Sequence, residues 1–129
     1  AVGNYAASFE LCKSFLINLF TILPVELLDT DDFSKVHEKA MFTKAIFANA
    51  IGYVGLSLLD EMVIDDSVTW DKLLPLDLPL ENMNADFWVK SKITMNDDGV
   101  IKIIKATDKR LGLTVCRSLR IYPSSKLTD

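Results

Sequence analysis

Hydrophobic residues near the start of the chain recur at steps of three and four, the spacing of one face of a helix. This pattern extends from Tyr5 to Leu23 and predicts a first helix there. Its apolar positions are Phe9, Cys12, Leu16, Leu19, Phe20 and Leu23. Pro24 disfavours a helical conformation at the residue before it, so we expect the helix to break there. The apolar run Phe15–Leu23 is about half of the roughly 20 residues that a membrane span needs, which favours a buried helix and no membrane association.

The second helix is predicted over Phe33–Met62 and is the most clearly patterned segment of the chain. A further helical turn is expected over Val25–Leu28, and the acidic segment Asp29–Asp32 is expected to cap the helix that follows. The apolar stripe of this helix keeps helical phase through Val36, Ala40, Phe47, Ile51, Val54, Leu58 and Met62. Because no charged residue lies between Lys44 and Asp60, this helix should be buried on nearly every side.

Small residues form a second stripe on the same helix. Its members, which are predicted to pack closely against another element, are Ala45, Ala48, Gly52 and Gly55. Glycine inside a helix costs about 1 kcal/mol relative to alanine, and close approach of another backbone is the usual compensation. The stripe also indicates a helical surface suited to protein interaction or oligomerisation.

Turn and proline signals follow the second helix. Residues Asp65–Ser67 have the composition of a loop, and a short helix is predicted over Val68–Leu74, where Pro75 ends it. The segment Leu76–Glu81 contains Pro79, so it is expected to be an extended, apolar connection rather than a regular helix.

A β-hairpin is predicted next, because the apolar period changes from helical to alternating. Alternation over Phe87–Met95 predicts a strand with one face inward. Residues Asn96–Gly99 have turn chemistry, and Val100–Ile104 returns as the partner strand. The hairpin would lie in the C-terminal third of the chain.

The end of the chain completes the predicted fold. A short last helix is expected from Thr107 or Asp108, either of which can cap it, to Leu111, with Gly112 as its stop. The polar residues 123–129 are expected to form a loose tail. The predicted fold class is α+β, mainly α, with a helical core around a central buried helix and one C-terminal β-hairpin.

Composition limits the class of protein further. The 129 residues are half apolar and one quarter charged, which predicts a single folded module over residues 1–129. Two cysteines are too few for a disulfide scaffold, so a cytoplasmic location is expected. The first residue is Ala1 rather than methionine, from which we expect a fragment or a processed chain.

Charge is distributed unevenly along the chain. Residues 1–86 contain five lysines and fourteen acidic residues, a net charge of -9, whereas residues 87–129 contain nine basic residues and four aspartates, a net charge of +5. The candidates for contact with DNA phosphates are Lys90, Lys92, Lys102, Lys105, Arg110, Arg117 and Arg120. The first three are expected to share the outer face of the hairpin with Trp88, an arrangement suited to stacking and phosphate contact. The alternative is that these cations only solvate the hairpin and the last helix, or that they face the acidic half of the molecule. In that alternative, lysines on an exposed strand prevent edge-to-edge aggregation and Trp88 belongs to the core.

No motif nominates residues for catalysis or metal binding. His37 beside Glu38 could act as a general base, but an exposed helix-surface histidine is the simpler interpretation, because no nucleophile signature lies near it. Cys12 and Cys116 lack metal-ligand spacing and are expected to be buried small hydrophobic residues. Caps and turns explain the aspartate clusters. We therefore expect no metal and no cofactor, and we favour a non-enzymatic role.

Several short segments, taken in order, resemble a known family. They are Ala50–Gly55 with Leu58 and Leu59, then Trp70 and Leu73–Asp77, then Asn84–Trp88 and the hairpin as far as Ile101. In this order they resemble the C-terminal region of DGQHR-domain, or DndB-like, proteins, over about Ala40–Ile104. The Asp-Gly-Gln-His-Arg signature of that family does not occur in this chain. The resemblance therefore implies that this chain is the C-terminal fragment of a longer protein and that the signature lies in a preceding segment.

The resemblance implies a cytoplasmic bacterial protein associated with DNA phosphorothioate modification and phage defence. Within such a protein, this chain would be a non-catalytic module of a DNA-binding transcriptional regulator or accessory factor. The alternative is a helical protein-interaction or oligomerisation module unrelated to DNA, whose partner is another protein or a second copy of the chain. The small-residue stripe and the apolar second helix support that alternative.

Overall fold

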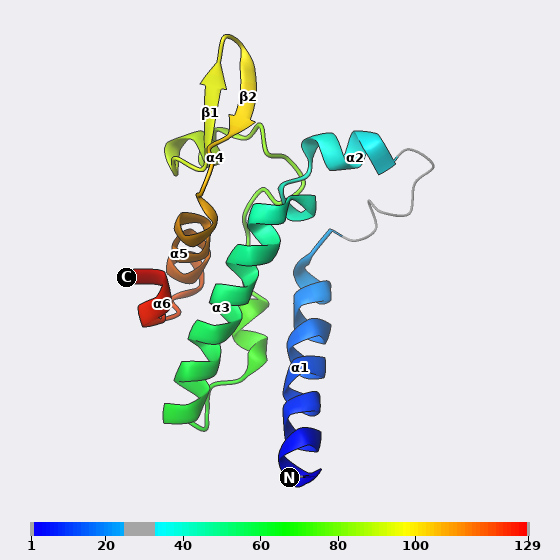
Figure 1. Cartoon of the computed structure of the whole chain (residues 1–129), viewed down its shortest axis with the longest axis vertical. Coiled ribbons are helices and arrows are strands. Elements are labelled where there is room, and N and C mark those ends of the chain that lie inside the picture. The colour runs from blue at the N-terminus through cyan, green and yellow to red at the C-terminus, as the bar shows by residue number, and fades with distance from the viewer. Residues whose placement is uncertain (1, 25–32, 129) are drawn as a thin grey trace.

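Helices make up most of the structure, and a single β-hairpin lies at one end of its described part (Figure 1). The computed structural model describes residues 2–24 and 33–128. The helices are α1 (Val2–Ile22), α2 (Phe33–Lys39), α3 (Ala45–Ile64), α4 (Asp86–Lys90), α5 (Asp108–Leu119) and α6 (Ser125–Thr128). The 3₁₀ helices are η2 (Met41–Thr43) and η3 (Trp70–Leu73), and the strands are β1 (Thr94–Asp97) and β2 (Val100–Ile103). The predicted class, α+β and mainly α, is confirmed.

The core is centred on α3 and α5, which contact each other more extensively than any other two elements in the described residues. From α3 it takes the middle of the predicted stripe, namely Phe47, Ile51, Val54 and Leu58. From α5 it takes Leu111, Val115, Cys116 and Leu119. By length and composition alone α3 could also span a membrane, a test that the core helix of a globular protein passes equally.

The predicted burial of α3 on nearly every side is wrong, because its neighbours cover only part of its circumference. Ala45, Ala48 and Gly52 of the small-residue stripe are exposed. A Cβ added at Gly52 would meet nothing within 4 Å, so this glycine is not a site of close packing. Gly55 is buried, and a Cβ there would lie 3.1 Å from the ring of Phe15. Close packing is therefore confirmed for Gly55 alone among the four.

The first predicted helix is confirmed as α1, which lies beside α3 and contacts η3 (Figure 1). The rings of Phe15 and Trp70 are 5.0 Å apart, and Leu19 is buried. Cys12 is exposed, so its predicted burial is wrong, whereas Cys116 is buried as expected. The reason is an apolar groove between α1 and α3 that remains open at Cys12.

The single helix predicted over Phe33–Met62 is broken between Ala40 and Lys44, both of which have extended backbones. Backbone hydrogen bonds to the Leu80–Met83 segment stabilise this break. The N–H of Met83 donates to the carbonyl of Lys39 at 2.6 Å, and the N–H of Phe42 donates to the carbonyl of Leu80 at 3.1 Å. Groups that a continuous helix would pair internally are thus paired with a distant segment, and the buried Met41 side chain joins the core.

The strand predicted over Phe87–Met95 is wrong for most of its length, because residues 86–90 form α4 instead. Trp88 decides the difference. Its side chain is fully buried, and its indole Nε1 donates to the carbonyls of Pro79 at 3.0 Å and Asn82 at 3.1 Å. Burying an indole N–H favours a conformation that supplies such partners. The expectation that Trp88 lies on an outer face is therefore wrong as well.

The hairpin itself is confirmed, with a shorter first strand. β1 and β2 pair in antiparallel register from Thr94 opposite Ile103 to Asp97 opposite Val100. The two residues between the strands, Asp98 and Gly99, both have positive φ, as a two-residue turn of this hand requires.

The last helix runs past its predicted stop, and residues 125–128 of the predicted loose tail form α6. α5 continues through Gly112 and ends where Arg120 adopts a left-handed conformation. Thr107 precedes α5, but its side chain donates to the carbonyl of Ile104 rather than capping the helix. Leu127 of α6 is buried against Gly112, and the N–H of Ser124 donates to Ser57 Oγ at 2.8 Å. The missing Cβ of Gly112 thus lets α3 and α6 approach α5 closely.

The predicted loop Asp65–Ser67 and the short helix after it are observed, the latter as η3. The expected turn over Val25–Leu28 and the expected cap over Asp29–Asp32 lie outside the described residues.

Candidate nucleic-acid interface

A basic groove lies between the segment that begins with α4 and the outer face of α5. Its volume is about 780 Å³. The α4 side contributes Phe87, Lys90, Ser91 and Lys92, and Leu78 lies with them. The α5 side contributes Arg110, Leu113, Thr114, Arg117 and Ser118. We call this feature the α4–α5 groove.

The α5 wall follows directly from helical periodicity. Its five residues occupy positions i, i+3, i+4, i+7 and i+8, which lie on one face of a helix. The opposite face carries Leu111, Val115 and Leu119, all buried in the core. Core packing therefore fixes the rotation of α5 and presents Arg110 and Arg117 to solvent, one near each end of the face.

The α4 wall is positioned by the buried Trp88. With the indole anchored to the Pro79–Asn82 connection, the neighbouring Lys90 points to solvent. The chain then turns sharply, because the N–H of Lys92 donates to the carbonyl of Val89 at 3.0 Å and Lys92 adopts a φ of 62°. This turn places Lys92 beside Lys90 on the rim.

A hydrogen bond connects the two walls. Arg110 Nη1 donates to the backbone carbonyl of Lys92 at 3.0 Å. A guanidinium has five N–H donors, so this bond uses only part of the capacity of Arg110. The bond fixes the distance between the walls and orients the Arg110 guanidinium at the groove.

The groove is electrostatically one-sided. Four of its lining residues are cations, and none of the lining residues in the described part of the chain is acidic. A concave surface lined by one sign of charge concentrates its field and attracts ions of the opposite sign. This arrangement suits a polyanion, since Arg and Lys can both reach phosphate oxygens.

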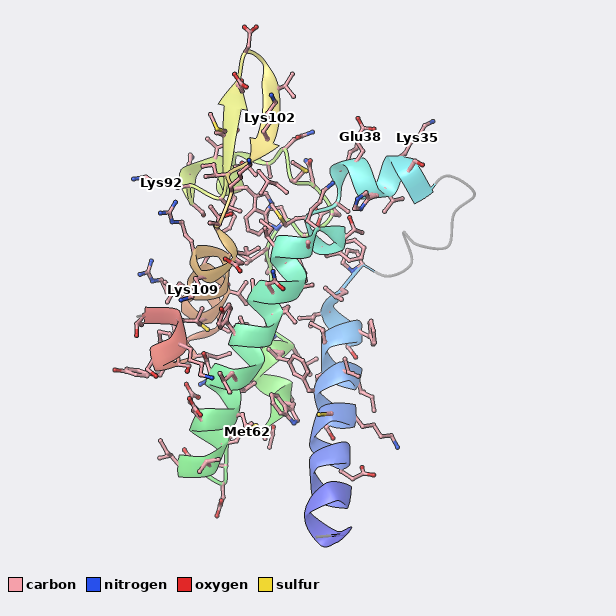
Figure 2. The ribbon with its side chains drawn as sticks, in the orientation of Figure 1. Lys35, Glu38, Met62, Lys92, Lys102 and Lys109 are labelled. Atoms are coloured by element: carbon pink, nitrogen blue, oxygen red, sulfur yellow. The ribbon has the colours of Figure 1, made fainter. Side chains whose placement is uncertain are left out.

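The structure brings together four of the seven predicted DNA-contacting residues, namely Lys90, Lys92, Arg110 and Arg117. The other three, Lys102, Lys105 and Arg120, do not line the groove. Lys102 lies further out on β2, where its Nζ is 3.0 Å from the carboxylate of Asp97 (Figure 2). The predicted face shared by Lys90, Lys92 and Lys102 is therefore wrong, because α4 replaces the strand that would have aligned them.

Sequence reasoning did not identify the apolar and hydroxyl residues of the groove. The helical spacing of Arg110, Leu113, Thr114 and Arg117 could have indicated this wall. The predicted helix stops at Gly112, however, so it leaves out three of these four residues, whereas α5 continues to Leu119. Phe87 lies in α4 rather than in the strand that the alternating pattern predicts. Both omissions come from local signals that tertiary packing overrides.

Within residues 2–24 and 33–128, the other candidate residues do not form a second site. His37 is exposed, as expected, and its Nδ1 lies 3.1 Å from Thr43 Oγ1. Burial raises the pKa of the Cys116 thiol, an effect that outweighs its contact with Ser57. In the described residues, no three His, Cys, Asp or Glu side chains are grouped so that they could hold a metal ion.

Comparison of the chain with protein-family models, with curated proteins and with solved structures found no match.

Proposed function

We propose that this chain is a non-catalytic module that binds nucleic acid through phosphate groups in the α4–α5 groove. The observation that carries the proposal is the set of four cations on two facing walls, with no acidic residue among the lining side chains. Residues 1–86 have a net charge of -9 and would repel phosphate, so this groove is the favoured point of contact.

The sequence resemblance to DGQHR-domain proteins specifies the proposal further. On that basis the nucleic acid is DNA, and the module belongs to a cytoplasmic regulator or accessory factor of DNA phosphorothioate modification. Groove geometry supports phosphate contact, whereas the link to DNA modification rests on the resemblance alone.

A salt titration of DNA binding tests the proposal. The groove variant Lys90→Gln/Lys92→Gln removes two positive charges from the rim. The control variant Lys102→Gln/Lys105→Gln removes the same charge from the hairpin side, outside the groove. On duplex DNA, the slope of log affinity against log salt should fall by about 0.9 for each phosphate that the groove variant no longer binds. The control should keep a slope close to that of the unmodified chain.

Equal reductions in the two variants would show that net charge, rather than the groove, determines binding. No binding by the unmodified chain at low salt, to single-stranded or duplex DNA, would remove the nucleic-acid function altogether.

A second candidate function is protein interaction, which exposed apolar side chains on α1 favour. Leu16, Ile17 and Phe20 are 47%, 57% and 55% exposed. Side chains of this size in contact with water are typical of a surface that meets another protein. Sedimentation of the folded chain tests the self-association form of this candidate, since a strictly monomeric chain argues against oligomerisation.

A further inference from the structure

The lining of the α4–α5 groove includes apolar side chains, which phosphate binding alone does not require. Leu78, Phe87 and Leu113 line it, and all three are half-buried. Cations and hydroxyl groups are sufficient to hold a sugar-phosphate backbone. Half-buried apolar side chains together with exposed cations instead match a ligand that has both a flat apolar part and a negative charge.

The Phe87 ring is held in a defined orientation. It makes an edge contact with the buried Trp88, with ring centroids 4.9 Å apart and planes at 80°. Trp88 is itself anchored by two hydrogen bonds. A ring fixed in this way loses little conformational freedom when a second flat group packs on it, which favours stacking.

The size of the groove suits a nucleotide. Its volume of about 780 Å³ falls in the range of roughly 300–1,000 Å³ that accommodates small organic ligands. Hydroxyl groups of Ser91 and Ser118 lie on opposite walls and can donate to or accept from base edges. A base in a duplex is paired and stacked, so it cannot enter a concave site of this kind.

We infer that the α4–α5 groove takes one unstacked nucleotide of a single strand, with the base on Phe87 and the flanking phosphates at Lys90, Lys92 and Arg117. This inference rests on the proposed function and adds to it the strand state of the nucleic acid. Single-stranded sites elsewhere combine the same two parts, a cationic path for the backbone and an aromatic platform for the bases.

The first test compares two probes on the unmodified chain. Fluorescence anisotropy measures affinity for a short oligothymidylate and for the duplex that it forms with its complement, in the same salt. We expect tighter binding of the single strand. This comparison needs no variant, so it does not depend on how a substitution affects folding.

The second test changes the aromatic platform. Phe87→Leu keeps an apolar side chain but removes the ring, and it should weaken single-strand binding at least about fivefold, the lower end of what one base–aromatic stack contributes. Phe87→Tyr keeps the ring and should retain single-strand binding. Thermal unfolding of both variants verifies that each is folded.

The outcomes separate this inference from the proposed function. Duplex binding as tight as single-strand binding, or a folded Phe87→Leu variant with unchanged affinity, overturns the inference while groove-dependent phosphate binding stands. If the unmodified chain binds neither the single strand nor the duplex, both the inference and the proposed function are overturned.

Discussion

Two helical glycines differ in what surrounds them, and this difference determines their roles. Gly52 on α3 is exposed, and a Cβ there would meet nothing within 4 Å. A Cβ on Gly112 would lie 2.9 Å from the Leu127 side chain and 3.4 Å from the carbonyl oxygen of Ala50. Gly112 is therefore required for close packing, whereas Gly52 only weakens its helix.

Substitution of these glycines should have effects of opposite sign. Gly52→Ala should raise the free energy of unfolding by about 0.5–1 kcal/mol, because alanine restricts the unfolded chain and favours a helix. Gly112→Leu should lower it by about 1–3 kcal/mol, because the added side chain overpacks the contact with α3 and α6. Urea unfolding measures both, and each variant serves as the control for the other. A decrease in stability in Gly52→Ala would contradict the open surroundings of that residue.

At the scale of the elements, Glu61 joins α3 to two other segments. Its Oε2 is 2.6 Å from the Nζ of Lys72 in η3, and its Oε1 accepts the N–H of Tyr122 at 2.6 Å. Burial raises the pKa of Glu61, but the hydrogen bonds from Lys72 and Tyr122 and the charge of Lys72 outweigh it, so the pKa is lowered from 4.5. The ionised carboxylate is therefore the form that stabilises the fold.

Glu61→Gln should lower the free energy of unfolding by about 1 kcal/mol at neutral pH. A group whose pKa is depressed by folding contributes stability above its unfolded pKa and loses it as the pH falls through its folded pKa. The difference between the unmodified chain and the variant should thus be full above about pH 4.5 and shrink at more acid pH. Urea unfolding at a series of pH values measures it. Asp60→Asn, at the adjacent exposed position, is the control. A difference that stays constant down to pH 2 would mean that the Glu61 charge is not involved.

At the scale of the whole molecule, the basic C-terminal third contributes both to the groove and to the core. The segment from Phe87 to Lys92 and the outer face of α5 form the groove. The final residues close the core, because Leu127 is buried and Ser124 is hydrogen-bonded to Ser57 of α3. A chain end with polar composition is therefore part of the folded unit.

Leu127→Ala should lower the free energy of unfolding by about 2–5 kcal/mol, as expected for a leucine removed from a core. Lys126→Ala, at the neighbouring exposed residue, should change it by less than about 0.5 kcal/mol. Thermal or urea unfolding of both variants provides the comparison. If the two variants are equally stable, residues 125–128 do not contribute to the core and behave as the loose tail that their composition predicts.

The sequence by itself determined the features that depend on neighbours along the chain. Helical periodicity predicted α1 and the buried face of α3, including Val54 and Leu58. Turn chemistry at Asp98 and Gly99 predicted the hairpin, because positive φ at both positions is a local property. The charge asymmetry, and with it the basic candidates of the C-terminal third, was readable by counting.

Only the tertiary structure decided the features that depend on partners distant in sequence. The break before α3 exists because Lys39 and Phe42 bond to residues of the Leu80–Met83 segment. α4 replaces a strand because the Trp88 indole finds the carbonyls of Pro79 and Asn82. These bonds form only after the chain has folded back, and their free energies exceed the weak local preferences of the residues involved. The α4–α5 groove results from these same contacts, so the sequence identified its four cations but not the groove that they line.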